Sequence, residues 1–216
     1  MQAIYYVAEG DSIAAGTVGP WPPFPVVFGA QHPEVTLNVM AQGGSRLQSS
    51  NGGVPQVVNR ASAVDAAKAA NPGYGKYVLS LLIGVNDAVT IGEGVDDVNT
   101  FLGILSAYCD ARRAAGWQVI LCTQIGAYAT SDAVMYPKWV AWRSTYDPTA
   151  RGWLGSHCDA VADFANNATM GPVDAASNNA ATYGTQSGYY WDVVHPNAAG
   201  QAKLAAPLAG AFAALT

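Results

Sequence analysis

The chain has 216 residues, a mass of 22.4 kDa and a formal net charge of −5. Half of its residues are hydrophobic and 12% are charged, a composition that favours a tightly packed α/β protein and argues against intrinsic disorder. The acidic balance and the absence of any run of lysine and arginine exclude nucleic acid as an expected partner, because phosphates require clustered basic groups.

Short apolar runs alternate with segments of helical spacing along the whole chain, and we expect one domain, residues 1–216. The apolar runs predict five strands, at 4–8, 35–40, 77–83, 118–123 and 160–164. Apolar spacing predicts helices at 55–70, 95–115 and 198–215, with a less regular candidate at 138–154. This alternation predicts a parallel sheet covered by helices on both faces.

Segments rich in glycine and asparagine separate these elements, at 43–53, 71–75 and 166–188. The third is longer than an ordinary connection, and such loops are often functional. In an open parallel sheet, ligands bind outside the carboxyl ends of the strands. We therefore expect the polar motifs that follow the first three predicted strands to meet at one edge of the sheet.

Gly10-Asp11-Ser12 follows the first predicted strand, at the start of a short helical segment. A serine hydroxyl there lies beside free backbone N–H groups and the positive end of a helix dipole, which favour a developing anion. Capping of that helix by Asp11 or Ser12 is the alternative interpretation of this motif taken alone. A phosphate-binding loop does not fit, because Thr17 stands where its lysine is needed.

His195 lies three residues after Asp192. A turn of this spacing brings carboxylate and imidazole together, so that Asp192 would orient His195 as a base for Ser12. The alternative is that Asp192 only accepts hydrogen bonds within the turn and His195 is a surface residue. The other histidines, His32 and His157, precede predicted strands, which places them away from the expected site.

Attack on an ester also requires hydrogen-bond donors for the oxyanion. The candidates are the backbone N–H of Ser12, the N–H of Gly43 or Gly44, and the side-chain amide of Asn86. Each has an ordinary alternative, because Gly-Gly and Asn-Asp pairs are common in loops and turns.

Four sequence blocks together resemble the SGNH hydrolases, also called GDSL-type esterases and lipases. In family order they are Gly10-Asp11-Ser12, Gln42-Gly43-Gly44-Ser45, Gly84-Val85-Asn86-Asp87 and Asp192-Val193-Val194-His195-Pro196. The resemblance implies a flavodoxin-like three-layer α/β/α sandwich with a five-stranded parallel sheet. It also implies that Ser12, Asp192 and His195 are catalytic and that Ser12, Gly44 and Asn86 form the oxyanion hole. Gly43 is the alternative to Gly44, because the glycine block lacks the family's usual Asn-x-Gly lead.

Two features beside these blocks bear on how the site is built. Glu9 stands where many members of the family carry an apolar residue, and we expect its carboxylate to bond nearby backbone or a neighbouring loop. Aromatic segments at 21–25 and 189–191 flank the serine and histidine motifs in the sequence. They form either the rim of a site for a sugar or aryl ester or part of the core.

The implied chemistry is ester hydrolysis through an acyl-enzyme on Ser12, with His195 acting first as base and then as acid. We expect short-chain acyl esters as substrates, small molecules or acetylated carbohydrates, and no metal or organic cofactor. An acyltransferase that uses the same site and a non-catalytic carbohydrate-binding or tail-fibre module are the alternatives. Activity is expected to fall on acidification, because the base must be neutral.

Nothing in the sequence indicates a membrane span, a metal site or a disulfide framework. The chain lacks any run of about 18 apolar residues, and its cysteines, Cys109, Cys122 and Cys158, are far apart and without CxxC spacing. The first residues resemble a core strand and not a signal peptide, which favours the cytoplasm, and a secreted protein whose signal has been removed is the alternative. The compartment and the oligomeric state are left open.

Overall fold

The computed structural model describes residues 2–89, 94–95, 97–127, 135–172 and 188–215. Its centre is a sheet of five parallel strands in the order β2-β1-β3-β4-β5. The strands are β1 (Ile4–Gly10), β2 (Val35–Val39), β3 (Lys76–Leu82), β4 (Gln118–Cys122) and β5 (Ala160–Ala162). The strand order reverses between β1 and β3, so the loops that leave these two strands border the position where open α/β sheets bind ligands.

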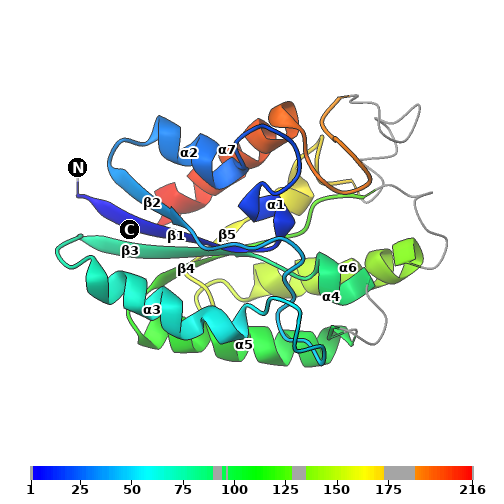
Figure 1. Ribbon diagram of the computed structural model, residues 1–216, viewed down its shortest axis with the longest axis horizontal. Helices are drawn as coiled ribbons and strands as arrows, with labels where there is room; N and C mark the ends of the chain where they lie inside the picture. The colour runs from blue at the N-terminus through cyan, green and yellow to red at the C-terminus, as the bar shows by residue number, and fades with distance from the viewer. Residues whose placement is uncertain (1, 90–93, 96, 128–134, 173–187, 216) are drawn as a thin grey trace.

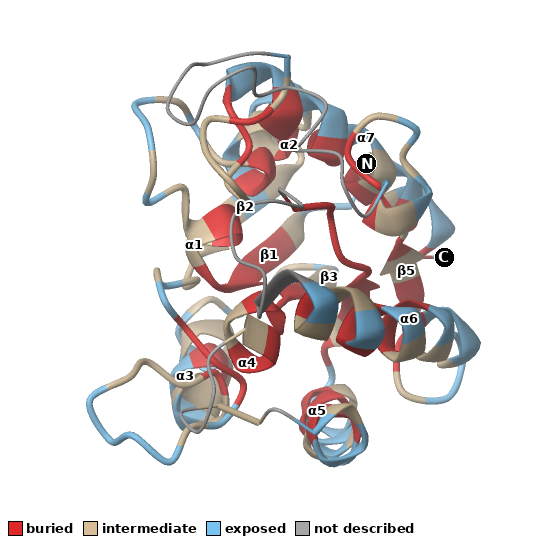
Figure 2. Ribbon diagram, turned by 90° about the vertical axis from the view of Figure 1, so that its right-hand side faces the viewer, coloured by how far each residue is buried: buried red, intermediate tan, exposed pale blue. Residues whose placement is uncertain are grey.

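Helices cover both faces of the sheet and give three layers (Figure 1). One face carries α2 (Phe24–Gln31) and α7 (Ala198–Ala214), and the other carries α3 (Ala61–Ala70), α5 (Val98–Ala114) and α6 (Met135–Gly152). The remaining short helices are α1 (Ser12–Ala15), η1 (Val58–Arg60), α4 (Val85–Val89) and η2 (Phe164–Asn166). Figure 2 shows that the strands other than β2 are largely buried between helices whose outer sides are exposed. The α/β fold predicted from the sequence is confirmed.

All five predicted strands are present, with ends that differ by one or two residues. β1 continues past the predicted end at Ala8, because Glu9 and Gly10 pair with Leu81 and Leu82 of β3. β5 is shorter than predicted, and Phe164 instead begins η2. The extension of β1 carries the chain to the residue just before Asp11 and so fixes where the serine motif starts.

The predicted helices differ more from the observed ones. The segment predicted as one helix at 55–70 is divided into η1 and α3, and α5 begins only at Val98, where the side chain of Asp97 accepts the N–H groups of Asn99 and Thr100. Helix α2 was not predicted, because its sequence is short, almost uniformly apolar and opened by prolines. Part of the predicted loop at 166–188, residues 173–187, lies outside the described residues.

The core lies on both sides of the sheet. Under α2 and α7, the ring of Tyr6 packs edge-on against Phe28 and Phe212, and its hydroxyl lies 2.7 Å from the Oγ of Ser80. On the other face, the indole of Trp142 packs against the rings of Phe101 and Tyr146. Aromatic pairs of this kind contribute beyond the area that they bury. Within the described residues, no helix combines the length and the apolar character needed to cross a bilayer.

Candidate active site

The serine motif occupies the turn between β1 and α1. Gly10 ends β1 with a φ of +148°, and a Cβ at this position would lie 2.2 Å from the carbonyl oxygen of Leu82, so glycine alone fits beside β3. Asp11 is the N-cap of α1, since its Oδ1 accepts the N–H of Ile13 at 3.0 Å. The capping interpretation therefore holds for Asp11, while the hydroxyl of Ser12 points to a different partner.

That partner is His195, which is more than 180 residues away in the sequence. The Oγ of Ser12 lies 2.8 Å from the Nε2 of His195, and the Nδ1 of His195 lies 2.8 Å from the Oδ2 of Asp192. Asp192 is held within its own turn, because its Oδ1 accepts the N–H groups of Val194 and His195 at 2.9 and 2.7 Å. The structure thus joins the three residues in one hydrogen-bonded series.

The electrostatics of this series keep Asp192 charged. Partial burial alone would raise the pKa of Asp192, but hydrogen bonds from the His195 ring and from the N–H groups of Val194 and His195 outweigh it, so the pKa lies below its ordinary value. A charged carboxylate at this position holds the Nδ1 proton of the imidazole and stabilises the imidazolium that forms when Nε2 accepts a proton.

Helix α7 brings His195 to Ser12. Asn197 caps this helix, with its side chain accepting the N–H groups of Ala199 and Gly200. One turn further, the buried Gln201 accepts the N–H of Phe24 at 2.8 Å and donates to the carbonyl of Ile13 at 3.4 Å. Gln201 therefore ties the helix that follows His195 to the helix that carries Ser12. Sequence reasoning missed this residue, since a glutamine in an apolar helix gives no local signal of its partners.

The glycine block forms a tight turn after β2. The N–H of Ser45 donates to the carbonyl of Gln42 at 3.2 Å, and Gly44 in the third position has a φ of +71°, as a type II turn requires. A Cβ on Gly43 would lie 2.9 Å from the Oγ1 of Thr17, whereas a Cβ on Gly44 would meet nothing within 4 Å. Gly44 is exposed and borders open space, whereas Gly43 faces the protein.

Asn86 lies in α4, directly after β3, where the sequence suggested only a turn. Its Nδ2 donates to the carbonyl of Ser45 at 2.9 Å, so the amide is oriented by the glycine turn and keeps its second N–H. Within the described part of the chain, the backbone N–H groups of Ser12 and Gly44 donate to no other protein group. Donors from three segments, which follow β1, β2 and β3, are thus available at this edge of the sheet.

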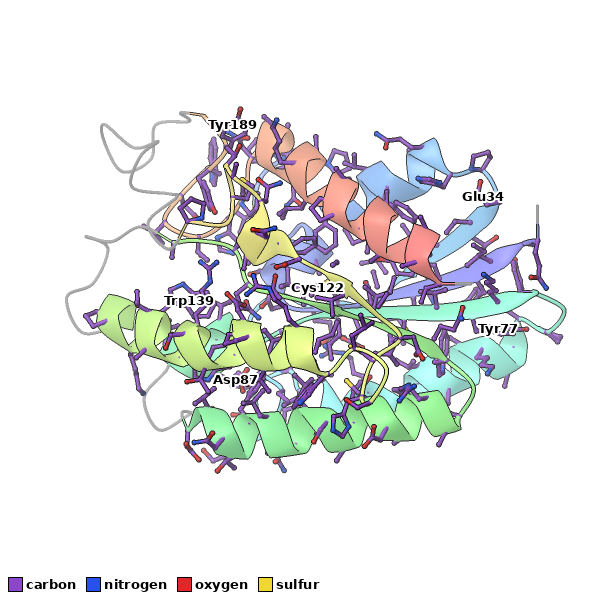
Figure 3. The ribbon with its side chains drawn as sticks, turned by 180° about the vertical axis from the view of Figure 1, so that it is seen from behind. Glu34, Tyr77, Asp87, Cys122, Trp139 and Tyr189 are labelled. Carbon is purple, nitrogen blue, oxygen red and sulfur yellow. The ribbon has the colours of Figure 1, made fainter. Side chains whose placement is uncertain are left out.

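Two buried carboxylates accompany the site. Burial raises the pKa of Asp11 to about 6 and that of Asp87 to about 7, although hydrogen bonds from the N–H groups of Ile13 and Leu47 oppose the rise. The Oδ1 and Oδ2 of Asp87 lie 3.1 and 3.0 Å from the N of Leu47, which fixes the chain just beyond the glycine turn. Figure 3 labels Asp87, which lies between α5 and α6 in this view. The sequence suggested no role for Asp87 beyond its place in the block.

Two tryptophans border the His195 turn. The rings of Trp21 and Trp191 are partly exposed and meet edge to face, with their centroids 5.3 Å apart. The indole Nε1 of Trp21 donates to the carbonyl of Pro196 at 3.0 Å, and the backbone N–H of Trp191 donates to the carbonyl of His195 at 2.8 Å. The neighbouring aromatics Phe24 and Tyr190 are instead buried in the core. Each of the two aromatic segments therefore contributes one ring to the border of the His195 turn and one ring to the core.

The remaining histidines pair with carboxylates away from Ser12. His32 pairs with Glu34 at 3.2 Å, and His157 pairs with Asp110 at 2.9 Å and not with Asp159, which is nearer in the sequence.

The cysteines are buried and free, and Cys122 lies on β4 in the interior (Figure 3). Burial raises the pKa of Cys109 to about 12 and that of Cys158 to about 11, which keeps these thiols protonated and unreactive. Among the described residues, no cluster of His, Cys, Asp and Glu is suited to a metal ion.

Comparison with known proteins identifies the fold and the family. A member of the lipolytic protein G-D-S-L family from Veillonella parvula is 16% identical, with a TM-score of 0.70 and coverage of 98% of this chain and 99% of that one. A GDSL-like lipase from Bacteroides thetaiotaomicron is 16% identical, with a TM-score of 0.65 and coverage of 97% and 87%. An acetyl xylan esterase, AlAXEase, is 20% identical, with a TM-score of 0.64 and coverage of 96% and 98%. At these identities the likeness shows the fold.

The family itself is shown by a match along most of the sequence. A comparison with curated proteins finds no significant match. The family model of the GDSL-like Lipase/Acylhydrolase family matches residues 8–203, a range that includes all four sequence blocks. The chain therefore belongs to the GDSL-like lipase/acylhydrolase family and is a serine carboxylic ester hydrolase.

Proposed function

We propose that this enzyme hydrolyses short-chain acyl esters through an acyl-enzyme on Ser12, within one catalytic domain formed by residues 1–216. The observation that carries the proposal is the series from Ser12 to His195 to Asp192, in which both linking distances are 2.8 Å. Such distances allow proton transfer from the hydroxyl to the imidazole as the nucleophile attacks.

In the first step, the Oγ of Ser12 attacks the ester carbonyl carbon while the Nε2 of His195 takes the hydroxyl proton. The tetrahedral intermediate then collapses, and the alcohol leaves with the proton from His195. In the second step, His195 deprotonates a water molecule that attacks the acyl-enzyme, and the acid is released as the proton returns to Ser12. Asp192 keeps the imidazole in one tautomer through both steps.

The oxyanion is assigned to the N–H groups of Ser12 and Gly44 and to the Asn86 amide. These groups come from the segments that directly follow β1, β2 and β3. Gly44 is preferred to Gly43 because the space beside it is open, whereas Gly43 packs against Thr17. Preorganised donors of this kind stabilise charge as it develops and need no rearrangement during the reaction.

Acetylated carbohydrate is the substrate class that the surroundings of the site favour. The partly exposed indoles of Trp21 and Trp191 lie beside the His195 turn and offer rigid apolar surface with polar edges. One of the structural relatives is an acetyl xylan esterase. A sugar that stacks on these indoles would present its acetyl group toward Ser12.

Hydrolysis of p-nitrophenyl acetate, butyrate and octanoate by the wild type and by Ser12→Ala tests this proposal. We expect the rate to fall with chain length and the variant to lose about 10⁴-fold or more in kcat. Mass spectrometry after treatment with a serine-reactive phosphonate should show one adduct, on Ser12. Activity that survives in Ser12→Ala, or an adduct elsewhere, would contradict the acyl-enzyme.

The substrate class needs a separate measurement, the release of acetate from acetylated xylo-oligosaccharides. Trp191→Ala should lower kcat/KM on the oligosaccharide more than on p-nitrophenyl acetate, because only the larger substrate reaches the indoles. An equal loss on both substrates would assign Trp191 to the support of His195 alone. Transfer of acetyl to an added sugar acceptor, in preference to water, would instead establish the acyltransferase.

A further inference from the structure

We propose that Arg60, held by the buried carboxylate of Glu9, is a positioning residue for the oxyanion hole, because it locks the glycine turn to the strand that leads to Ser12. The inference rests on the proposed function, since it assumes that Gly44 and Asn86 act as oxyanion donors. It adds to that function a pair of residues that touches neither the substrate nor the reacting atoms.

Glu9 anchors the pair. It is the second-last residue of β1 and is fully buried. Its Oε1 accepts three hydrogen bonds: one from the Nε of Arg60 at 3.0 Å, one from the Nη2 of Arg60, and one from the backbone N–H of Gly10 at 3.1 Å. The guanidinium is also largely enclosed, with 11% of the Arg60 side chain exposed. A fork of two donors on one carboxylate oxygen leaves Arg60 little freedom to turn.

The outer edge of the same guanidinium reaches the glycine turn. The Nη1 of Arg60 donates to the Oγ of Ser45 at 3.0 Å, and the Nη2 donates to the carbonyl of Gly10 at 3.2 Å. The carbonyl of Gly10 also accepts the N–H of Gln42, the first residue of the turn, at 3.1 Å. Arg60 therefore links the end of β1 directly to Ser45 at the last position of the turn, and the same Gly10 carbonyl holds Gln42 at its first position.

Ser45 passes this restraint on to two proposed donors. It is buried and follows Gly44 directly, and its N–H donates to the carbonyl of Gln42 at 3.2 Å. Where Ser45 is held therefore restrains the turn whose Gly43–Gly44 peptide carries the proposed N–H donor of Gly44. The carbonyl of Ser45 accepts the Nδ2 of Asn86 at 2.9 Å, which sets the direction of that amide. A shift of Ser45 would thus move the turn and the amide together, while the Ser12 and His195 pair would remain in place.

Stability alone explains the pair poorly. The Oε2 of Glu9 is buried and has no hydrogen-bond partner among the described residues. Burial raises the pKa of Glu9, and the hydrogen bond and charge of Arg60 only oppose that rise. A buried ion pair with an unpartnered oxygen is often no more stable than an apolar pair of the same size. The geometry that the pair imposes on the turn is its distinctive contribution.

The test compares four purified full-length variants with the wild type. Arg60→Met removes the ion pair with Glu9. Arg60→Lys keeps the positive charge but cannot donate two parallel hydrogen bonds. The double variant, Glu9→Leu with Arg60→Met, replaces the ion pair by two apolar side chains. Arg113→Met is the control, because it breaks an ion pair with Asp159 at the opposite edge of the sheet. The measurements are Tm, kcat and KM on p-nitrophenyl acetate, and inhibition by phenylboronic acid, which forms a tetrahedral adduct on the nucleophilic serine.

A positioning role predicts that kcat falls about 10- to 100-fold in Arg60→Met and in the double variant, while KM changes little. The inhibition constant for phenylboronic acid should rise in parallel, because the boronate needs the same donors. The double variant should recover the Tm that Arg60→Met loses without recovering kcat. Arg60→Lys should recover Tm but only part of kcat, and the control should keep its kcat.

The proposal is overturned if the double variant retains wild-type kcat, or if kcat returns in step with Tm in Arg60→Lys. It is also overturned if boronate affinity is unchanged in Arg60→Met. Failure of the proposed function gives a different result, since the wild type itself would then show no hydrolysis that depends on Ser12. A loss of kcat in the control equal to that in Arg60→Met would assign the effect to general destabilisation and reject the positioning role.

Discussion

The carboxylates at the two ends of the sheet differ in their burial and in their hydrogen bonding. At the amino end, the side chains of Asp65 and Asp159 are 37% and 26% exposed, and both oxygens of each accept hydrogen bonds. At the carboxyl end, beside Ser12, Glu9 and Asp11 are fully buried, and one oxygen of each has no partner in the described part of the chain. Unpartnered buried carboxylate oxygens cost free energy, so these two carboxylates favour stability less than Asp65 and Asp159 do.

The difference separates two kinds of polar interaction. At the amino end, Asp65 and Asp159 form ion pairs with arginines of α5. The rings of Tyr77 and Trp117 pack together there, and the ammonium group of Lys68 lies over both rings. The carboxyl-end groups instead hold loops in fixed positions relative to one another. Substitutions at the first end should therefore change stability with little effect on the reaction, whereas substitutions at the second should change the reaction, whether or not stability changes as well.

The largest expected contrast concerns two asparagines. Asn86→Ala at the carboxyl end should lower kcat on p-nitrophenyl acetate about 100-fold with little change in KM, because the amide acts on the oxyanion and not on the bound ester. Asn71→Ala at the amino end removes only a hydrogen bond to the carbonyl of Ala67 and should keep kcat. A rise in KM alone for Asn86→Ala would place this residue in substrate binding.

An intermediate effect concerns stability as a function of pH. An unfolded aspartate titrates near about pH 3.9, whereas burial raises the pKa of Asp11 to about 6 and of Asp87 to about 7. The native state holds both protons more tightly, so their stabilising contribution is present below about pH 4 and is lost as the pH rises through the two native values. Each pKa unit of separation corresponds to about 1.4 kcal/mol.

Tm should therefore decrease from about pH 5 to about pH 8. Asp87→Asn carries no charge at any pH and should flatten this dependence. Asp192, whose pKa is lowered, acts in the opposite sense only in more acidic solution. A Tm that rises steadily over the range, or an unchanged profile in Asp87→Asn, would show that these carboxylates are not the groups responsible.

The smallest expected effect is at the amino end. Asp65→Asn removes the charge that faces Arg112 but keeps an oxygen for the indole of Trp117, so it should cost about 0.5 to 1 kcal/mol of the free energy of unfolding. Urea denaturation measures this loss, which should shrink at high salt because a partly exposed pair is screened. Steady-state kinetics should show wild-type kcat. A substantial loss of kcat would remove the distinction between the two ends.

Local patterns in the sequence determined much of the fold. Apolar runs such as those at 4–8 and 77–83 form strands in the structure, because a strand buried on both faces is apolar along most of its length. The alternation of these runs with helical segments predicted a parallel sheet, and parallel topology places the residues after each strand at one edge. This reasoning predicts Ser12, Gly44 and Asn86 at that edge, and the segments that carry them do follow β1, β2 and β3 there.

What only the tertiary structure decided concerns partners far apart in the sequence. Helix α2 forms although its apolar sequence has no helical period, because it packs against α7 through Phe28 and Phe212. His157 pairs with Asp110 and not with Asp159, which is nearer in the sequence. Glu9 pairs with Arg60, which lies 51 residues further along the chain. Burial and pairing energies depend on distances in space, which propensity and spacing in the sequence do not contain. The chemistry of the motifs is therefore local, whereas the geometry that holds them together belongs to the folded chain.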